Sequence, residues 1–419
     1  MGQPHHKVNH FDDMPKVRSF SAHMSVIETW APLSSFTLLR VLAIENCSTT
    51  YGSRIHIEEV GHLLHLRYLS LNDTSVDKVP EEIGALKLLQ TLDLWRSFIE
   101  ELPPSISLLT QLMCLRISFG KAPDSSSDTV WLERLTSLEE LQVQIDDTGT
   151  GRWLVRGLGS LSSLRVLKAE FDYDVESERE LVESLRRLHK LQHLSIEGYH
   201  YYSRATWEVA GFVLPRHLRL LAVGVGFSKL PSCINPGCLP SLSHLQLTLE
   251  KVDEQDLKIL GGLPELSCLH LFLWSSANKK WSLVRQVGQH PLISTRGSSH
   301  GNGEDAIATP SASFHESKSS ICSKDDAATS RFMPNLQVLD FCASRQAVRD
   351  HRYCNNLGLE YLPSLREISV HVRRPRNVSD AEAEKTEAAL RSAANVHPNR
   401  PTLHMTTIRT GIPFFGSCG

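Results

Sequence analysis

A leucine pattern that returns every 23 residues is the feature of this sequence that most restricts its fold. The frame LxxLxxLxL begins at Leu63 and begins again at Leu86 and at Leu109. Further frames bring the total to twelve, with spacings mostly between 23 and 29 residues. A unit this short cannot bury its apolar face alone, so the repeats must stack into a solenoid. The frame centres are Leu42, Leu69, Leu92, Leu115, Leu141, Leu167, Leu194, Leu221, Leu245, Leu269, Leu339 and Ile368.

Each LxL centre predicts a short strand whose alternate side chains point into the core. In the stretches VDKVPEEI and IEELPPSI, Pro80 and Pro103 turn the chain away from strand pairing. The apolar residues over 178–188 have helical spacing, which predicts a helix on the back of the solenoid, away from the strands. These features predict an α/β leucine-rich-repeat solenoid. Its curved parallel sheet forms the concave face, and helices, 3₁₀ turns and loops form the convex face.

The ninth place of the frame predicts how each strand ends. Cys47, Thr74 and Ser97 occupy this place in three regular repeats. Small polar side chains and Cys at such a place tie the turn after the strand to the next backbone.

A break in the repeats divides the chain. The frame jumps from Leu269 to Leu339. Within this gap, residues 294–330 are rich in Ser, Gly and Asp and contain almost no aliphatic residues. A segment of this composition cannot form a packed repeat. We predict an N-terminal extension (1–16), leucine-rich repeats (17–274), a disordered Ser/Gly-rich insertion (275–330), final repeats with a C-terminal cap (331–409) and a tail (410–419).

The cap is predicted from two signals. Residues 379–382 form a capping-box pattern that opens an Ala- and Glu-rich helix ending at about Ala394. A last edge strand is predicted near residues 403–408, because an open solenoid needs its terminal repeat covered.

The charge balance argues against several partners and compartments. A net charge of −3 and a pI of about 6.7 give no electrostatic basis for binding nucleic acid or an anionic membrane. No apolar stretch approaches the roughly 20 residues that span a bilayer. Nine cysteines without regular spacing and a start lacking an apolar signal core favour a reducing compartment, the cytosol or the nucleus. The oligomeric state is left open.

Motifs for chemistry are missing from the sequence. No phosphate loop, HExxH, paired CxxC, GxSxG or kinase signature occurs, so neither an enzyme nor a cofactor is expected. His62 with His65, and Cys233 with Cys238, are the candidate metal pairs. Neither pair has further ligands at a zinc-site spacing, so exposed or structural roles are favoured.

A binding surface therefore becomes the functional hypothesis. Counted from the first Leu of LxxLxL, positions 3, 5, 7 and 8 are predicted to project from the concave sheet, and aromatic and Arg residues there are typical interface hot spots. Asp93 and Arg116 are accordingly expected to be replaceable without loss of stability. The predicted protein-binding residues are Tyr68, Asn72, Asp73, Asp93, Trp95, Arg96, Arg116, Phe119, Lys168, Phe171, His270 and Phe272.

Several strings resemble one family. MPKVRSF (14–20), LRVLAIENC (39–47), the paired repeats of residues 65–117, LPSLREISV (362–370) and HPNRPTL (397–403) resemble the repeat region of plant intracellular coiled-coil nucleotide-binding disease-resistance proteins, especially those of grasses. The resemblance implies a non-enzymatic module that senses pathogen effectors or holds a nucleotide-binding switch inactive. Its partner is then an effector, a host protein or a nucleotide-binding module. A general intracellular repeat scaffold in signalling is the alternative.

Overall fold

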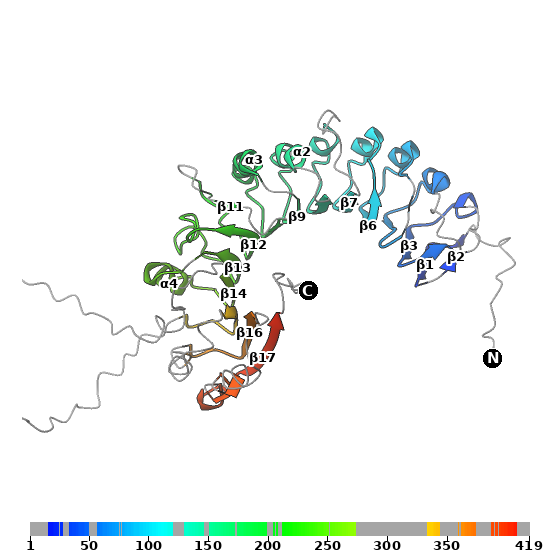
Figure 1. Ribbon diagram of the computed structural model, residues 1–419. Coiled ribbons are helices and arrows are strands. Elements are labelled where there is room, and N and C mark those ends of the chain that lie inside the picture. The colour runs from blue at the N-terminus through cyan, green and yellow to red at the C-terminus, as the bar shows by residue number, and fades with distance from the viewer. Residues whose placement is uncertain are drawn as a thin grey trace, which may run out of the picture.

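A curved solenoid is the architecture of this chain (Figure 1). Strands line the inside of the arc and helices cover its outside, with β1 near one end and β17 near the other. The computed structural model describes residues 16–24, 26–27, 33–49, 57–74, 76, 78–119, 130–145, 151–171, 174–198, 204–205, 207, 212–250, 252–273, 333–343, 359, 362–373, 387–388, 390–392 and 394–408.

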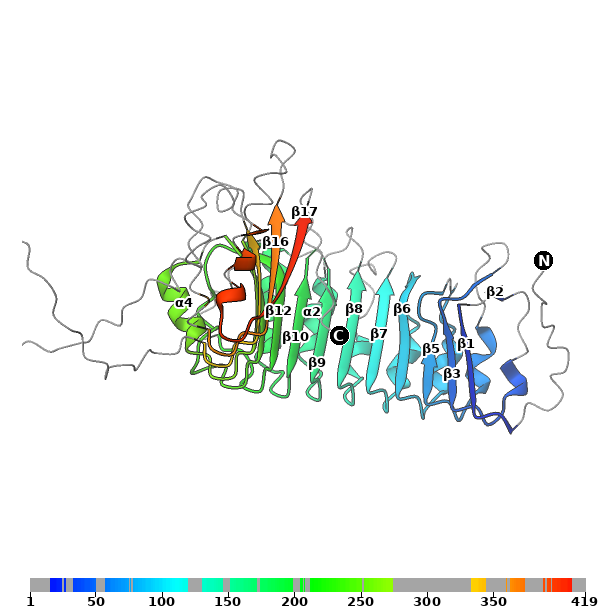
Figure 2. The same ribbon diagram turned by 90° about the horizontal axis from the view of Figure 1, so that it is seen from below.

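One parallel sheet runs along the arc, with its strands in chain order (Figure 2). All twelve predicted frame centres lie in this sheet, and the predicted last strand is present as β17, whereas β1 was missed because it contains no leucine. The strands in order are β1 (Ser19–His23), β3 (Val41–Glu45), β5 (Tyr68–Ser70), β6 (Thr91–Ile99), β7 (Cys114–Phe119), β8 (Glu140–Ile145), β9 (Val166–Glu170), β10 (His193–Glu197), β12 (Leu220–Phe227), β13 (His244–Leu249), β14 (Cys268–Leu273), β15 (Val338–Ala343), β16 (Glu367–Arg373) and β17 (Thr402–Ile408).

The register of the sheet stacks equivalent leucines. Leu69 is the Cα partner of Leu92, and Leu92 is the partner of Leu115. All three side chains are fully buried, as the frame predicts. Two short additions flank the sheet: β11 (Arg204–Ala205) pairs with the end of β12, and β2 (Val26–Ile27) pairs with β4 (Ser48–Thr49).

The regular repeats carry 3₁₀ helices on the convex side. Pro80 and Pro103 are extended residues immediately before two of these helices, which confirms the predicted turns. Gly84 allows the helices to stack closely, because a Cβ there would lie 2.7 Å from Cβ of Ser105 in the next repeat. The 3₁₀ helices are η2 (Leu33–Ser35), η3 (Glu58–His62), η4 (Glu81–Ala85) and η5 (Pro104–Leu108).

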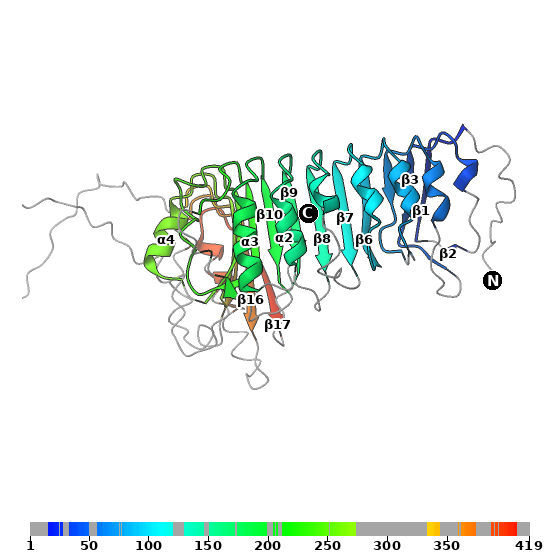
Figure 3. The same ribbon diagram turned by 90° about the horizontal axis from the view of Figure 1, so that it is seen from above.

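The irregular repeats carry α-helices instead (Figure 3). The predicted helix over residues 178–188 is α3, which begins earlier because the Asp174 carboxylate accepts a hydrogen bond from the backbone N–H of Ser177 at 2.7 Å. No described helix is long and apolar enough to cross a membrane. The α-helices are α1 (Val130–Glu133), α2 (Arg152–Leu158), α3 (Val175–Leu185) and α4 (Glu254–Gly261).

The ninth place of the frame acts as predicted. The Ser97 hydroxyl donates to the carbonyl of Leu71 in the preceding repeat, at 2.5 Å. The Thr74 hydroxyl donates to the same carbonyl from within its own turn. The Cys47 thiol lies 3.6 Å from the carbonyl of Ala22, so it also reaches the preceding repeat.

The repeats continue across the break in the sequence. Strands β14 and β15 pair directly, and the backbone N–H of Gln337 donates to the carbonyl of Ser267 at 2.8 Å. Residues 394–396 are helical, slightly past the predicted helix end. The predicted insertion at 275–330, the extension before residue 16, the capping box at 379–382 and the tail at 410–419 lie outside the described residues.

Candidate functional site

The concave face of the sheet carries the side chains at positions 3, 5 and 7 of each frame, as strand alternation predicts. Their role in binding remains a prediction. Of the predicted binding residues, Tyr68, Asn72, Trp95, Arg116 and His270 are partly exposed here, and Lys168 is exposed.

Position 8 behaves differently in the first regular repeats. Asn46, Asp73 and Arg96 occupy it with φ values of 52°, 53° and 58°, which are left-handed conformations. A left-handed residue breaks the alternation of the strand, and in β6 the regular pairing with β7 is interrupted after Leu94. Asp73 and Arg96 are accordingly exposed, at the edge of the concave face.

Two of the predicted surface aromatics are instead core residues. Phe119 and Phe171 occupy position 8 but are 1% and 0% exposed. Phe119 packs edge-on against Trp153, with ring centroids 5.5 Å apart. The prediction failed because in these repeats the chain continues in the extended form and does not enter a left-handed turn. Alternation then directs position 8 into the core.

Phe272 was also predicted as an exposed contact, and this was wrong. It lies at position 7 of β14 but is only 4% exposed. Its ring lies 6.0 Å from that of His371, which comes from β16. Phe272 therefore lies on the concave face but is covered by neighbouring side chains.

Asp93 is on the concave side, yet it is only 2% exposed. Its carboxylate accepts hydrogen bonds from the Trp95 backbone N–H at 3.0 Å and from the Arg116 guanidinium at 3.3 Å. Burial raises the pKa of Asp93, and the contacts with Trp95 and Arg116 partly offset the rise. Arg116 also reaches Glu140 at 2.9 Å. The expectation that Asp93 faces solvent is therefore wrong, because its side chain is buried.

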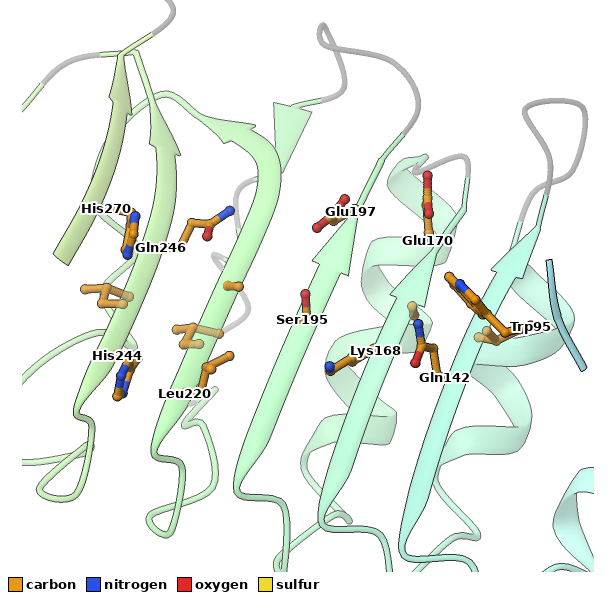
Figure 4. A pocket seen from close by; sticks show the side chains of 15 residues that line it. Trp95, Gln142, Lys168, Glu170, Ser195, Glu197, Leu220, His244, Gln246 and His270 are labelled. Atoms are coloured by element: carbon orange, nitrogen blue, oxygen red, sulfur yellow. The ribbon is translucent and has the colours of Figure 1, made fainter. Parts of the chain in front are cut away.

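A hollow of about 270 Å³ lies on the concave face between Trp95 of β6 and His270 of β14 (Figure 4). Its floor is mainly aliphatic, and polar side chains surround the floor. The side chains lining it are Trp95, Gln142, Val143, Lys168, Ala169, Glu170, Ser195, Glu197, Leu220, Leu221, Ala222, His244, Leu245, Gln246 and His270.

The hollow is charged on one side. Glu170 and Glu197 are Cα partners on neighbouring strands, and both carboxylates lie toward the strand ends, beyond Lys168 and Ser195 (Figure 4). Burial raises the pKa of Glu197, and the charge of Glu170 raises it further. Burial lowers the pKa of His244, with His270 adding to the effect, which favours a neutral His244. The hollow therefore combines an aromatic side chain, an aliphatic floor and an acidic rim.

The sequence-based hypothesis placed Trp95, Lys168 and His270 on the concave face, where they line this hollow, but it did not include the floor. Leu220 and Ala222 occupy positions 3 and 5 of the frame centred on Leu221, which offers no polar or aromatic residue there. The frame position alone could have identified them. Residue type, used as the criterion, excluded them.

The candidate metal pairs have other surroundings. His62 and His65 are exposed on the flank of a regular repeat. Cys233 is buried, which raises the pKa of its thiol to about 12, and the Asn235 amide lies 3.2 Å from the Cys238 sulfur. Among the residues that the structure describes, no three His, Cys, Asp or Glu side chains converge to hold a metal ion.

Comparison with a known family agrees with this geometry. The pattern that defines the family described as "Leucine-rich repeat region" matches residues 16–403. A solved structure of an LRR protein from Leptospira interrogans aligns with 92% of this chain and 89% of its own, at 15% identity and a TM-score of 0.49.

Curated relatives come from plants. The disease resistance protein RGA5 of Oryza sativa subsp. japonica is 24% identical over 92% of this chain and 32% of its own length. Disease resistance RPP8-like protein 3 of Arabidopsis thaliana is 30% identical over 58% of this chain and 26% of its own length. The chain thus spans no more than about a third of either relative.

Proposed function

The chain belongs to the leucine-rich-repeat family, and from this we propose that it is a non-enzymatic recognition module of plant disease resistance whose concave face binds a protein. The observation that carries the proposal is the hollow between β6 and β14. Its lining combines features that suit a macromolecular partner, and the relatives suggest the biological setting.

The extent of the hollow favours a protein over a small molecule. Its lining residues come from seven strands, from β6 to β14. Because β7 also lies within this span, it covers seven strand spacings of about 4.8 Å, or roughly 34 Å. A drug-sized ligand would occupy only part of that length, whereas a helix or loop of a protein would fill it.

The composition of the hollow supports the same conclusion. Trp95 is partly exposed at one end of the hollow. Interfaces between proteins typically place such aromatic anchors in a largely apolar centre. Glu170, Glu197 and Lys168 add charges that would select a complementary partner, since charge complementarity contributes more to specificity than to affinity.

Plant defence is proposed from the relatives, which are disease resistance proteins. Two partners suit this role. One is a pathogen effector or a host protein that the module senses. The other is a nucleotide-binding module that the repeats hold inactive. We place the chain in the cytosol or the nucleus, where such partners would be met.

The test is affinity capture of partners by the full-length chain from infected and uninfected plant tissue. The variant Trp95→Ala/Lys168→Ala alters the hollow. A matched control, Glu81→Ala/Arg179→Ala, replaces two exposed residues on η4 and α3 of the convex side. We expect the wild type and the control to retain the same protein in equal amounts. The hollow variant should retain at least tenfold less of it.

The identity of the captured protein distinguishes the two roles. A partner found only in infected tissue supports effector sensing, and a nucleotide-binding protein present in both tissues supports autoinhibition. A kinase or other signalling protein with no link to defence would favour the general scaffold. Equal retention by both variants would show that binding does not use the hollow.

A further inference from the structure

At the β14 end of the hollow, a thiol, an imidazole and a carboxylate stand in line on the concave face. The Cys268 sulfur lies 2.9 Å from Nε2 of His270, and Nδ1 of the same ring lies 2.9 Å from a carboxylate oxygen of Asp340. Cys268 and His270 are two residues apart on β14 and therefore share a face. His270 and Asp340 are Cα partners on β14 and β15.

The carboxylate determines where His270 carries its proton. Asp340 is also approached by His371, whose Nε2 lies within hydrogen-bond distance of the same oxygen, Oδ2, at 3.3 Å, and 3.0 Å from Oδ1. Burial tends to raise the pKa of Asp340, but hydrogen bonds from His270 and His371 outweigh it and lower the pKa. An ionised carboxylate only accepts hydrogen bonds, so both rings must donate to it. The proton of neutral His270 is thus on Nδ1, and Nε2 is free to accept the thiol proton.

A nucleophile within hydrogen-bond reach of a base, which is in turn oriented by a third group, is the general arrangement that activates a thiol. We propose that Cys268 is a nucleophilic thiol that is covalently modified by small electrophiles, with His270 as its base and Asp340 as the positioning residue. Only 7% of Cys268 is exposed, which favours small reagents such as hydrogen peroxide over larger ones.

With hydrogen peroxide the reaction is balanced as follows. His270 Nε2 takes the thiol proton, and the sulfur attacks one peroxide oxygen as the O–O bond breaks. The departing hydroxide takes the proton from His270 and leaves as water. The sulfur is oxidised by two electrons to a sulfenic acid, and the peroxide is reduced.

Another cysteine of the same face provides an internal comparison. Cys114 occupies position 3 of its frame, as Cys268 does, but burial and the neighbouring Glu140 raise its pKa to about 11. The flanking Cα partners of Cys268 are His244 on β13 and Val338 on β15. Neither is acidic, so neither opposes a thiolate at Cys268 as Glu140 does at Cys114.

The test measures the rate of alkylation by iodoacetamide as a function of pH in the intact full-length chain, with each cysteine followed by peptide mass spectrometry. Limited access lowers the alkylation rate of a thiol by the same factor at every pH. The pH at which the rate is half-maximal therefore reports the ionisation of the thiol and not its accessibility. We expect the Cys268 midpoint to lie below the usual value of about 8.5. The midpoint of Cys114 should lie above it. Brief treatment with hydrogen peroxide, trapped with dimedone, should label Cys268 before Cys114.

Two variants separate activation from general unfolding. His270→Gln should move the Cys268 midpoint upward by at least one pH unit, and Asp340→Asn should move it upward by less. The Cys114 midpoint in the same samples must stay unchanged, which shows that the fold is intact. A wild-type midpoint at or above 8.5, or a midpoint that His270→Gln leaves in place, would overturn the proposal.

Discussion

The guanidinium of Arg116 reaches across from β7 to the carboxylate of Asp93 on β6, with Nη1 3.3 Å from Oδ2. The two residues are Cα partners, but their side chains differ in exposure, at 39% for Arg116 and 3% for Asp93. A buried carboxylate therefore depends on a cation that remains half in solvent. Because of this asymmetry, removing the partly exposed Arg116 is costly, since it leaves a buried carboxylate behind.

Replacing Arg116 by Ala should lower the free energy of unfolding by about 1–3 kcal/mol, because it leaves the buried Asp93 carboxylate without its cation. Asp93→Asn in the same chain should recover part of the loss, since an amide needs no counter-charge and can still accept from the Trp95 N–H. Urea unfolding of both single variants and the double variant tests this. Equal stability of Arg116→Ala and the wild type would contradict it.

Gly84→Ala should destabilise the chain by about 1–3 kcal/mol, as overpacking does. The added Cβ would lie 2.7 Å from the Cβ and 2.9 Å from the carbonyl oxygen of Ser105 in the next repeat. The matched control is Gly237→Ala, where the nearest atom would be 3.4 Å away. Thermal unfolding of the two variants should separate them clearly. A similar melting temperature for both would mean that the convex helices can move apart at little cost.

Stability should depend on pH through Glu197. Its pKa in the folded chain is raised by burial and by Glu170, so the folded state binds more protons than the unfolded state above about pH 4.3. Stability from this group is thus present at low pH and is lost as pH rises through the raised pKa.

Glu197→Gln removes this dependence, so the variant should gain stability relative to the wild type between pH 4 and pH 7.5. Urea unfolding at both pH values measures the gain. The control is Glu81→Gln, at an exposed residue on the convex side. Its effect on the free energy of unfolding should be small and equal at the two pH values. A relative loss of stability for Glu197→Gln at pH 7.5 would reverse the sign of the argument.

Trp95 and Arg96, the predicted anchor pair, should be replaced by different amino acids. Arg96 has a φ of 58°, so Gly suits this position better than Ala. Trp95→Ala/Arg96→Gly should leave the free energy of unfolding within about 1 kcal/mol and weaken binding of the captured partner by 2 kcal/mol or more. Urea unfolding measures the stability of the variant, and isothermal titration calorimetry measures its affinity for the captured partner. Unchanged affinity would move the binding site toward the repeats beyond β8.

Deleting the predicted insertion should be tolerated, because β14 and β15 already pair with each other. Replacing residues 275–330 by ten Gly and Ser residues leaves 13 residues between Leu273 and Met333, as between Leu249 and Leu263. Stability should stay equal or rise slightly, since each halving of loop length saves about 0.6 kcal/mol of closure entropy. A large fall in the cooperativity of unfolding would show that the segment is part of the folded repeats.

Much of the candidate site followed from the sequence, and the failures have separate causes. Trp95, Lys168 and His270 were placed on the concave face by the period-two alternation of a strand, which is a local property. Phe119 and Phe171 were misplaced because the end of each strand depends on whether position 8 adopts a left-handed turn. Phe272 is buried by packing between repeats, and one of its neighbours, His371, is more than ninety residues away in the chain.

The amino-acid sequence by itself determined the leucine rows, the strands and the order of the repeats. These depend on the spacing of apolar residues along the chain, which fixes the side of each strand that is buried. Only the tertiary structure decided that Asp93 is buried beside Arg116, that Cys268, His270 and Asp340 stand in line, and that residues from seven strands enclose one hollow. Apart from the contact of Cys268 with His270, these contacts join residues of different repeats. They depend on the curvature and register with which whole repeats stack, and no single repeat encodes either.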